Sequence, residues 1–280
     1  MFPLKDNLRC LNPATVTLWL ILANVLAFFW EVGMMVSGHG NELFGTYLMV
    51  PHNFVTAFSS GDPSAIGWAC ATIFTSMFLH GSFGHIFGNM VFLYVFGKGM
   101  ENRIGKLNYL GFYLVCGVLA TLTHIFSDPS SVAPTLGASG AIAGVLGGYL
   151  FFWRNATISG FYVYPAPAYV HTKAYWFLIG WFVMQFSGVL DHVGSVNQIN
   201  HVSSMFTSGQ ISAQVLAATQ AASEGGVAYW AHIGGFLSGF ILAGIFRLIR
   251  PNSEVVCEMP EANCKPEDKN SKFRFFGKKK

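Results

Sequence analysis

Charged side chains are scarce in this chain of 280 residues. Asp, Glu, Lys and Arg make up 10% of the sequence, whereas 52% of the residues are hydrophobic. A soluble domain usually carries about a quarter charged residues, so the composition excludes an ordinary soluble fold and makes lipid the solvent for most of the chain. The net charge of +3 has its source mostly in the C-terminal tail, and nucleic acid is not an expected partner.

The sequence also lacks the patterns that mark a metalloprotein or a disulfide-rich protein. Its five cysteines are an odd number without CxxC spacing, so neither a disulfide framework nor a zinc site is indicated. We expect no metal and no cofactor. No internal repeat is visible, so the inverted-repeat signature of many transporters is missing.

The chain is instead rich in apolar runs that match the thickness of a bilayer. A helix needs roughly 20 apolar residues to cross a hydrocarbon core of ~30 Å. We predict an all-α, polytopic membrane domain over residues 14–249 with six transmembrane helices. The predicted spans are 14–37, 84–100, 107–127, 137–153, 174–189 and 228–249.

The basic residues predict the orientation of these spans. All sixteen Lys and Arg residues lie near the connections on one side of the six spans or in the two terminal segments, and the connections 38–83, 128–136 and 190–227 contain none. Cytoplasmic loops carry the excess of Lys and Arg. We therefore expect a cytoplasmic N-terminal segment over residues 1–13 and a basic, disordered cytoplasmic tail over residues 250–280.

Membrane lipids are a further expected partner, because Lys278, Lys279 and Lys280 end the chain with three positive charges that suit anionic headgroups. A solvated tail without lipid specificity is the simpler alternative.

Four polar residues lie inside the predicted spans, where such side chains are costly and mark candidate sites. They are His85 and Asn89 in the second span, Ser139 in the fourth and His232 in the sixth. These even-numbered spans all run inward from the outer face, and each residue lies within about two helical turns, ~10 Å, of the start of its span. One such residue alone would ordinarily be structural, but four at one depth favour a functional site.

Small residues predict that the fourth and sixth spans pack closely. Gly140, Gly144 and Gly148 recur at intervals of four, as do Gly235, Gly239 and Ala243. Such spacing lets membrane helices approach backbone to backbone, which a serine–histidine hydrogen bond of ~3 Å between two helices requires. Helix packing without chemistry explains the glycines equally well.

At these residues the chain resembles the rhomboid family of intramembrane serine proteases. The matching patterns are His85-x-x-x-Asn89, Gly137-x-Ser139-Gly140 and Ala231-His232-x-x-Gly235-x-x-x-Gly239, with Glu101-x-Arg103-x-Gly105 after the second span. The first three occur in this order on the second, fourth and sixth spans. The resemblance covers about residues 14–249 and implies a six-helix bundle of the compact prokaryotic type, in a plasma membrane with both termini cytoplasmic.

The resemblance implies a serine endopeptidase that cuts transmembrane segments of other membrane proteins near the outer face. Ser139 is then the nucleophile and His232 the general base, without an acidic third member. His85 and Asn89 are expected to stabilise the oxyanion. The glycines expected to support helix packing are Gly137, Gly140, Gly235 and Gly239.

The chain departs from the family pattern at Ala143. Some family members carry an aromatic residue there, one turn after the nucleophile and beneath the catalytic histidine. A Phe or Tyr from a neighbouring span is the expected substitute. We also expect the long connection 190–227 to cap the site and to move when substrate enters. His80, just before the second span, either supports the site from its loop or is a surface residue without a role in it.

Two other functions remain open at this stage. A non-proteolytic protein could hold membrane helices in the same cavity, but it would need neither Ser139 nor His232. A small-solute transporter could use the buried histidines as a proton relay, but this leaves unexplained the pattern around Ser139 and the absence of repeats.

Overall fold

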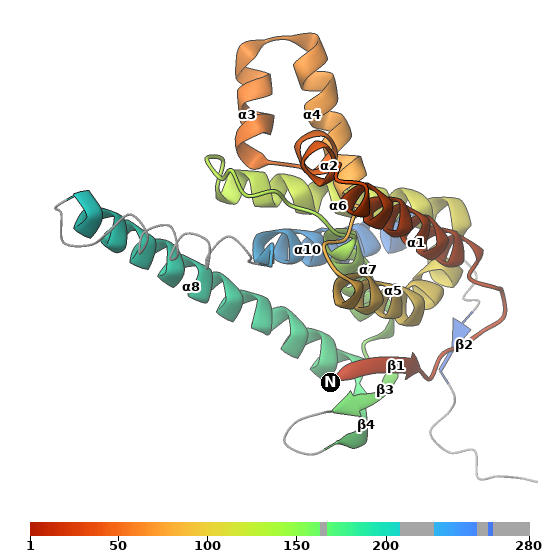
Figure 1. The fold of residues 1–280 in the computed structure, drawn as a ribbon. Helices are drawn as coiled ribbons and strands as arrows, with labels where there is room; N and C mark the ends of the chain where they lie inside the picture. Colours follow the sequence, from red (N-terminus) through yellow and green to blue (C-terminus); the bar gives the residue numbers. More distant parts are fainter. Residues whose placement is uncertain (163–166, 208–226, 251–256, 260–280) are drawn as a thin grey trace, which may run out of the picture.

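The computed structural model describes residues 1–162, 167–207, 227–250 and 257–259 of the chain. Each predicted span contains a helix, so the all-α polytopic membrane fold is confirmed. The long helices are α1 (Thr15–Val36), α5 (Phe83–Ile104), α6 (Lys106–Ser127), α7 (Ser139–Trp153), α8 (Ala174–Thr207) and α10 (Tyr229–Ile249). Figure 1 shows α7 and α10 surrounded by the other long helices.

Three of these helices, α1, α6 and α10, are individually long and apolar enough to cross a membrane. Helix α7 and the apolar part of α8, Ala174–Leu190, are shorter. Helix α5 is as long as α1, with 22 residues, but carries Lys98, Glu101 and Arg103 in its last turns. The count of six spans therefore stays a prediction.

The connection between α1 and α5 contains three shorter helices. They are α2 (Gly40–Tyr47), α3 (Pro51–Ser60) and α4 (Pro63–Ser76). Figure 1 shows α3 and α4 as a hairpin that projects from the bundle. Asp62 caps α4 by accepting hydrogen bonds from the N–H groups of Ser64 and Ala65, and Trp68 on its surface is half exposed.

Short strands, which the sequence did not predict, lie at the opposite end of the bundle. Strands β1 (Phe2–Asp6), β3 (Thr157–Tyr162) and β4 (Ala168–Lys173) form an antiparallel sheet in the order β1-β3-β4. Strands β2 (Arg9–Cys10) and β5 (Cys257–Glu258) form a second antiparallel pair. The N-terminal segment thus pairs with a connection between two long helices and with a piece of the tail.

The prediction of a loop over residues 190–227 was wrong for its first part, although the apolar part of α8, Ala174–Leu190, agrees with the predicted span 174–189. Helix α8 continues past residue 189 to Thr207, so residues 190–207 are helical rather than part of a loop. Hydropathy falls after Leu190, but the loss of apolar residues ends only the membrane-compatible part, since backbone hydrogen bonding continues in any solvent. The rest of the predicted capping loop, 208–226, lies outside the described residues.

Helix α1 is capped by a distant residue. Its own N-cap position, Ala14, supplies no side-chain hydrogen bond. The Glu101 carboxylate on α5 instead accepts from the N–H groups of Val16 at 2.9 Å and Thr17 at 2.8 Å, and from the Thr17 hydroxyl at 2.8 Å. A negative charge at this position satisfies otherwise unpaired donors and complements the helix dipole. The contact fastens the start of α1 to the end of α5.

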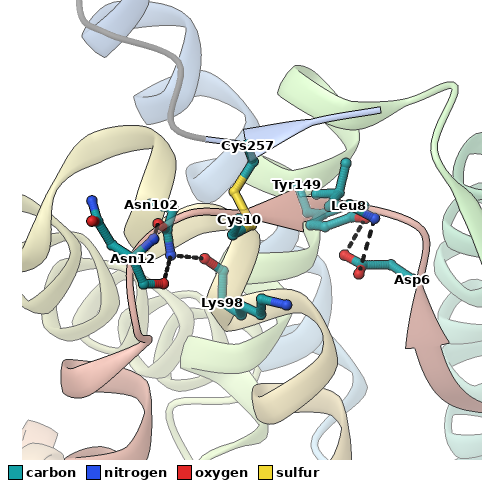
Figure 2. Close-up of a disulfide and its surroundings, with 8 residues drawn as sticks. All are labelled: Asp6, Leu8, Cys10, Asn12, Lys98, Asn102, Tyr149 and Cys257. Atoms are coloured by element: carbon teal, nitrogen blue, oxygen red, sulfur yellow. Dashed lines mark hydrogen bonds between the residues drawn. A yellow bond between two sulfur atoms is a disulfide. The ribbon is translucent and has the colours of Figure 1, made fainter. Parts of the chain in front are cut away.

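The sequence indicated no disulfide framework, but the structure contains one disulfide. Cys10 and Cys257 form a disulfide that joins β2 to β5 across a sequence separation of 247 residues. Figure 2 shows hydrogen bonds on either side of it: Asn102 donates to the carbonyl groups of Asn12 and Lys98, and Asp6 accepts from Tyr149 and Leu8. No Cys spacing announces this bond, because the pairing depends on how the two ends of the chain meet.

Helices α7 and α10 touch through their backbones. A Cβ atom added to Gly235 would overlap the carbonyl oxygen of Gly140, and one added to Gly239 would overlap that of Gly144. These glycines belong to the two series that predicted close packing. The approach leaves no room for side chains between the two helices along this face.

We expect Gly239→Ala to destabilise the protein by about 1–3 kcal/mol, since its methyl group would force two backbones apart. Gly244→Ala on the same helix is the matched control. Its Cβ would lie 3.5 Å from the Phe151 ring, an ordinary contact, and alanine is the better helix former by about 1 kcal/mol. Thermal unfolding in detergent measures both, and equal melting temperatures would refute the backbone contact.

Candidate active site

Ser139 and His232 lie within hydrogen-bonding distance of each other. Ser139 is the first residue of α7, and His232 lies in the first turn of α10. The Ser139 Oγ and the His232 Nε2 are 2.8 Å apart. His232 is buried, while Ser139 is half-buried. The two predicted residues are thus brought together by helices that start at the same end of the bundle.

His85 faces the backbone that precedes Ser139. A Cβ atom added to Gly137 would lie 2.9 Å from Cε1 and 3.0 Å from Nε2 of the His85 ring, and 3.7 Å from the Ser139 Oγ. Gly137 also has a φ of 121°, which side-chain-bearing residues rarely adopt. Gly137 therefore packs against the His85 imidazole, whereas the prediction gave it a role in packing helices.

Asn89 pairs with His80, the loop residue whose role the sequence left open. The Asn89 Nδ2 lies 2.9 Å from the His80 Nε2, and the His80 Nδ1 lies 3.3 Å from the Phe78 carbonyl oxygen. A carbonyl only accepts, so Nδ1 carries the proton and Nε2 accepts from the Asn89 amide. The His80 backbone N–H donates to the Glu31 carboxylate at 2.8 Å, which ties this loop to α1.

The surroundings keep His80 neutral. Burial lowers the pKa of His80 to about 4, and the neighbouring His85 ring acts in the same direction. At neutral pH the imidazole is therefore uncharged and free to accept the hydrogen bond from Asn89.

Two residues of α8 that the sequence reasoning missed also contact His232. The Gln185 Oε1 lies 2.8 Å from the His232 Nδ1, and the Trp181 ring lies 5.7 Å from the imidazole, centroid to centroid, at 38°. The available signal was a lone amide in an otherwise apolar span. Without a spacing rule that linked it to His232, the sequence did not distinguish it from a packing residue.

Trp181 accounts for the departure at Ala143. The Ala143 side chain is fully buried, and its Cβ lies 3.3 Å from where a Cβ on Gly235 would be. Helix α10 runs too close to α7 for a large ring at this position. The neighbouring aromatic comes from another span, as expected, but it is a Trp where a Phe or Tyr was predicted.

A small cavity lies beside Ser139. Its volume is about 30 Å³, enough for one water molecule. Polar residues of its lining include Ser76, Thr121, Thr135 and Ser139. The first N–H groups of α7 lie at the same place without acceptors inside their own helix, and the positive end of the helix dipole favours negative charge there.

The site places a serine hydroxyl beside a histidine imidazole, with no charged side chain hydrogen-bonded to that imidazole. Both ring nitrogens of His232 have neutral neighbours, the Ser139 hydroxyl and the Gln185 amide. Among the residues that the structure describes, no group of three or more His, Cys, Asp or Glu side chains is arranged to hold a metal ion.

Comparison with known proteins identifies relatives of the region that holds this site. Over 100 residues the chain is 33% identical to Rhomboid protein 1, mitochondrial, of Saccharomyces cerevisiae (34% of this chain, 29% of the relative). It is 30% identical over 106 residues to YdcA of Bacillus subtilis (37% and 51%). It is 30% identical over 142 residues to Rhomboid-like protein 11, chloroplastic, of Arabidopsis thaliana (50% and 43%). The chain therefore spans about half the length of these relatives or less.

The model of the Rhomboid domain matches residues 67–249, which is more than half of the chain. The matched region begins within α4 and includes α5, α7, α8 and α10. These helices carry His85, Asn89, Ser139, Gln185 and His232. Membership of this family, together with helices apolar enough to cross a membrane, supports a multi-pass membrane protein. The chain belongs to the Rhomboid family.

Proposed function

We propose that the chain is an intramembrane serine endopeptidase with Ser139 as nucleophile and His232 as general base. The observation that carries this proposal is the 2.8 Å contact between the Ser139 Oγ and the His232 Nε2. This is the distance over which a base removes a proton from a nucleophile. Family membership supports the proposal in its coarser form, an intramembrane protease.

In the proposed reaction the Ser139 Oγ attacks the scissile carbonyl carbon while its proton passes to the His232 Nε2. The protonated Nε2 then donates to the leaving amine, and the peptide bond breaks to leave an acyl ester on Ser139. A water molecule gives a proton to Nε2 as its oxygen attacks the ester. Collapse of this second intermediate returns the proton to Ser139 and releases the new carboxyl group.

The negative charge that develops on the carbonyl oxygen needs donors. His85 and Asn89 are proposed to supply them, together with the first N–H groups of α7 and the positive end of its dipole. His80 serves this arrangement indirectly. It accepts one Asn89 N–H at 2.9 Å, which orients the amide and leaves its second N–H for the oxyanion.

The proposed substrates are transmembrane segments of other membrane proteins. Helix α7 has 15 residues and is therefore about 22 Å long, shorter than the ~30 Å hydrocarbon core. A nucleophile at its first residue lies below the outer surface, yet near enough for water to reach. A helical substrate must unwind to expose a peptide bond, so segments with Gly, Pro or polar residues near the outer face are preferred.

The proposed topology has six spans over 14–249, with the segment 1–13 and the tail 250–280 in the cytoplasm of a prokaryote and the tail near anionic lipids. The basic residues of the connections favour this orientation. The Cys10–Cys257 disulfide lies at the end of the bundle that carries these basic connections. Cytoplasmic thiols, however, are normally reduced. The basic residues thus favour a cytoplasmic location for this end of the bundle, whereas the disulfide favours an external one.

A protein that merely holds membrane helices is the alternative. It would not depend on a hydroxyl paired with an imidazole, so the reactivity of Ser139 separates the two functions.

The reactivity of Ser139 is tested by labelling the detergent-solubilised protein with a fluorophosphonate. We expect the wild type to be labelled, Ser139→Ala to be inert and His232→Ala to react about 10²- to 10⁴-fold more slowly. Ser238→Ala is the control, because this α10 hydroxyl donates to its own helix at Gly234. A folded wild type that stays unlabelled, or a Ser139→Ala variant that labels equally, would falsify the mechanism.

The low pKa of His80 predicts a loss of stability in acid. The unfolded chain takes up a proton near pH 6.5, whereas the folded protein does so only near pH 4. The free energy of unfolding should therefore fall by about 3 kcal/mol as the pH drops from about 6.5 to about 4. Melting temperatures across this range should show a smaller decrease for His80→Gln, which keeps an acceptor for Asn89. An identical decrease in both proteins would contradict the assignment.

The orientation is tested by introducing one cysteine at a time in a Cys70→Ser, Cys264→Ser background, which keeps only the buried Cys116 and the disulfide-bonded Cys10 and Cys257. Ser130→Cys lies on the predicted outer connection and Lys106→Cys on the predicted inner side, and both positions are exposed. A membrane-impermeant maleimide should label Ser130→Cys in intact cells and Lys106→Cys only after permeabilisation. The reverse pattern would invert the proposed topology and place the disulfide outside.

A further inference from the structure

The Gln185 side chain links a backbone carbonyl of α8 to the imidazole on α10. Its Nε2 donates to the Trp181 carbonyl oxygen at 2.9 Å, and its Oε1 lies 2.8 Å from the His232 Nδ1. Gln185 is buried. We infer that Gln185 is a positioning residue that sets the tautomer of His232 and takes the place of an acidic third member. This inference rests on the proposed function.

The Trp181 carbonyl decides which way the amide points. A carbonyl oxygen only accepts hydrogen bonds, so the NH₂ group of Gln185 must face it. The opposite orientation would place two acceptor oxygens 2.9 Å apart. The Gln185 Oε1 therefore faces His232.

The amide in turn decides which imidazole nitrogen carries the proton. The Oε1 atom accepts but cannot donate, so the His232 Nδ1 must be protonated to form the 2.8 Å contact. In a neutral imidazole this leaves a lone pair on Nε2, the nitrogen 2.8 Å from the Ser139 Oγ. That is the tautomer required to accept the serine proton. The other tautomer would oppose two lone pairs at Nδ1.

Contacts on either side of Gln185 hold this part of α8 against α10. The Phe182 and Phe236 rings stack with centroids 4.5 Å apart at 24°. A Cβ atom added to Gly188 would overlap the Tyr229 ring, so the two helices are close there as well. The Trp181 ring packs on the imidazole within the same stretch. Helix α8 thus fixes both the plane and the tautomer of His232.

A neutral acceptor suits the location of the site. A carboxylate buried at this depth would carry a desolvation penalty of several kcal/mol, and charged groups inside a membrane are costly. An amide oxygen sets the same tautomer without that penalty, at the cost of weaker stabilisation of the imidazolium formed during the reaction.

The first test measures kcat and KM on a fluorogenic transmembrane peptide. Gln185→Met keeps the length of the side chain but removes the acceptor, and we expect kcat to fall roughly tenfold to a hundredfold with KM changed less than about twofold. Gln185→Glu restores an acceptor for His232 but loses the donor to the Trp181 carbonyl, so it should recover only part of kcat. Met184→Leu, at the exposed neighbouring position, is the control and should match the wild type.

The second test observes the tautomer without catalysis. In ¹⁵N-histidine-labelled protein carrying Ser139→Ala, the His232 signals are assigned by comparison with His232→Ala. With Gln185 present, the ¹⁵N shifts should report a proton on Nδ1 and none on Nε2. Adding Gln185→Met should produce a mixture of both tautomers, which a purely structural role would not cause.

The outcomes separate this inference from the proposed function. Cleavage that persists in Ser139→Ala overturns the dyad itself. If Ser139→Ala is inactive but Gln185→Met keeps both kcat and the tautomer, the protease reading stands and the role of Gln185 is wrong. Should Gln185→Met fail to fold, Gln185→Asn replaces it: this amide is one methylene too short to reach His232. An undiminished kcat in that variant overturns the inference.

Discussion

The direct contact between the backbones of α7 and α10 is the constraint on which the rest of the site depends. Gly235 and Gly239 lie against the carbonyl groups of Gly140 and Gly144, and only this approach places Ser139 within 2.8 Å of His232. The same approach excludes a large side chain at Ala143. An aromatic neighbour for the imidazole must then come from a third helix, and α8 supplies it as Trp181.

Several polar side chains inside the bundle form hydrogen bonds with the protein's own backbone. Glu101 accepts from the first N–H groups of α1, Glu31 accepts from the N–H of His80, and Gln185 donates to the carbonyl of Trp181. In a membrane, where water is not available to satisfy them, such groups would otherwise be very costly. These contacts also orient the site residues, since His80 holds Asn89 and Gln185 holds His232.

Much of the architecture could be predicted, because an apolar segment inside a membrane must form a helix to satisfy its backbone hydrogen bonds. Apolar runs located all six long helices, and the glycine spacing located the α7–α10 contact. The extension of α8 to Thr207 was missed since a helix need not end where it leaves the membrane. The strands and the Cys10–Cys257 bond were missed because they join segments far apart in sequence, and no local pattern records such a pairing.

The candidate site divides in the same way. Residue type, spacing and the predicted direction of the spans were enough to select Ser139, His232, His85 and Asn89. A polar side chain within an apolar run can be recognised from the sequence alone, because burying it in a membrane is costly. Which atoms meet was decided only by the packed helices. The contact of Gly137 with His85 and that of His80 with Asn89 depend on how the chain packs in three dimensions. The same holds for the contacts of Gln185 and Trp181 with His232. Side-chain packing sets these distances, and the periodicity of the sequence does not record them.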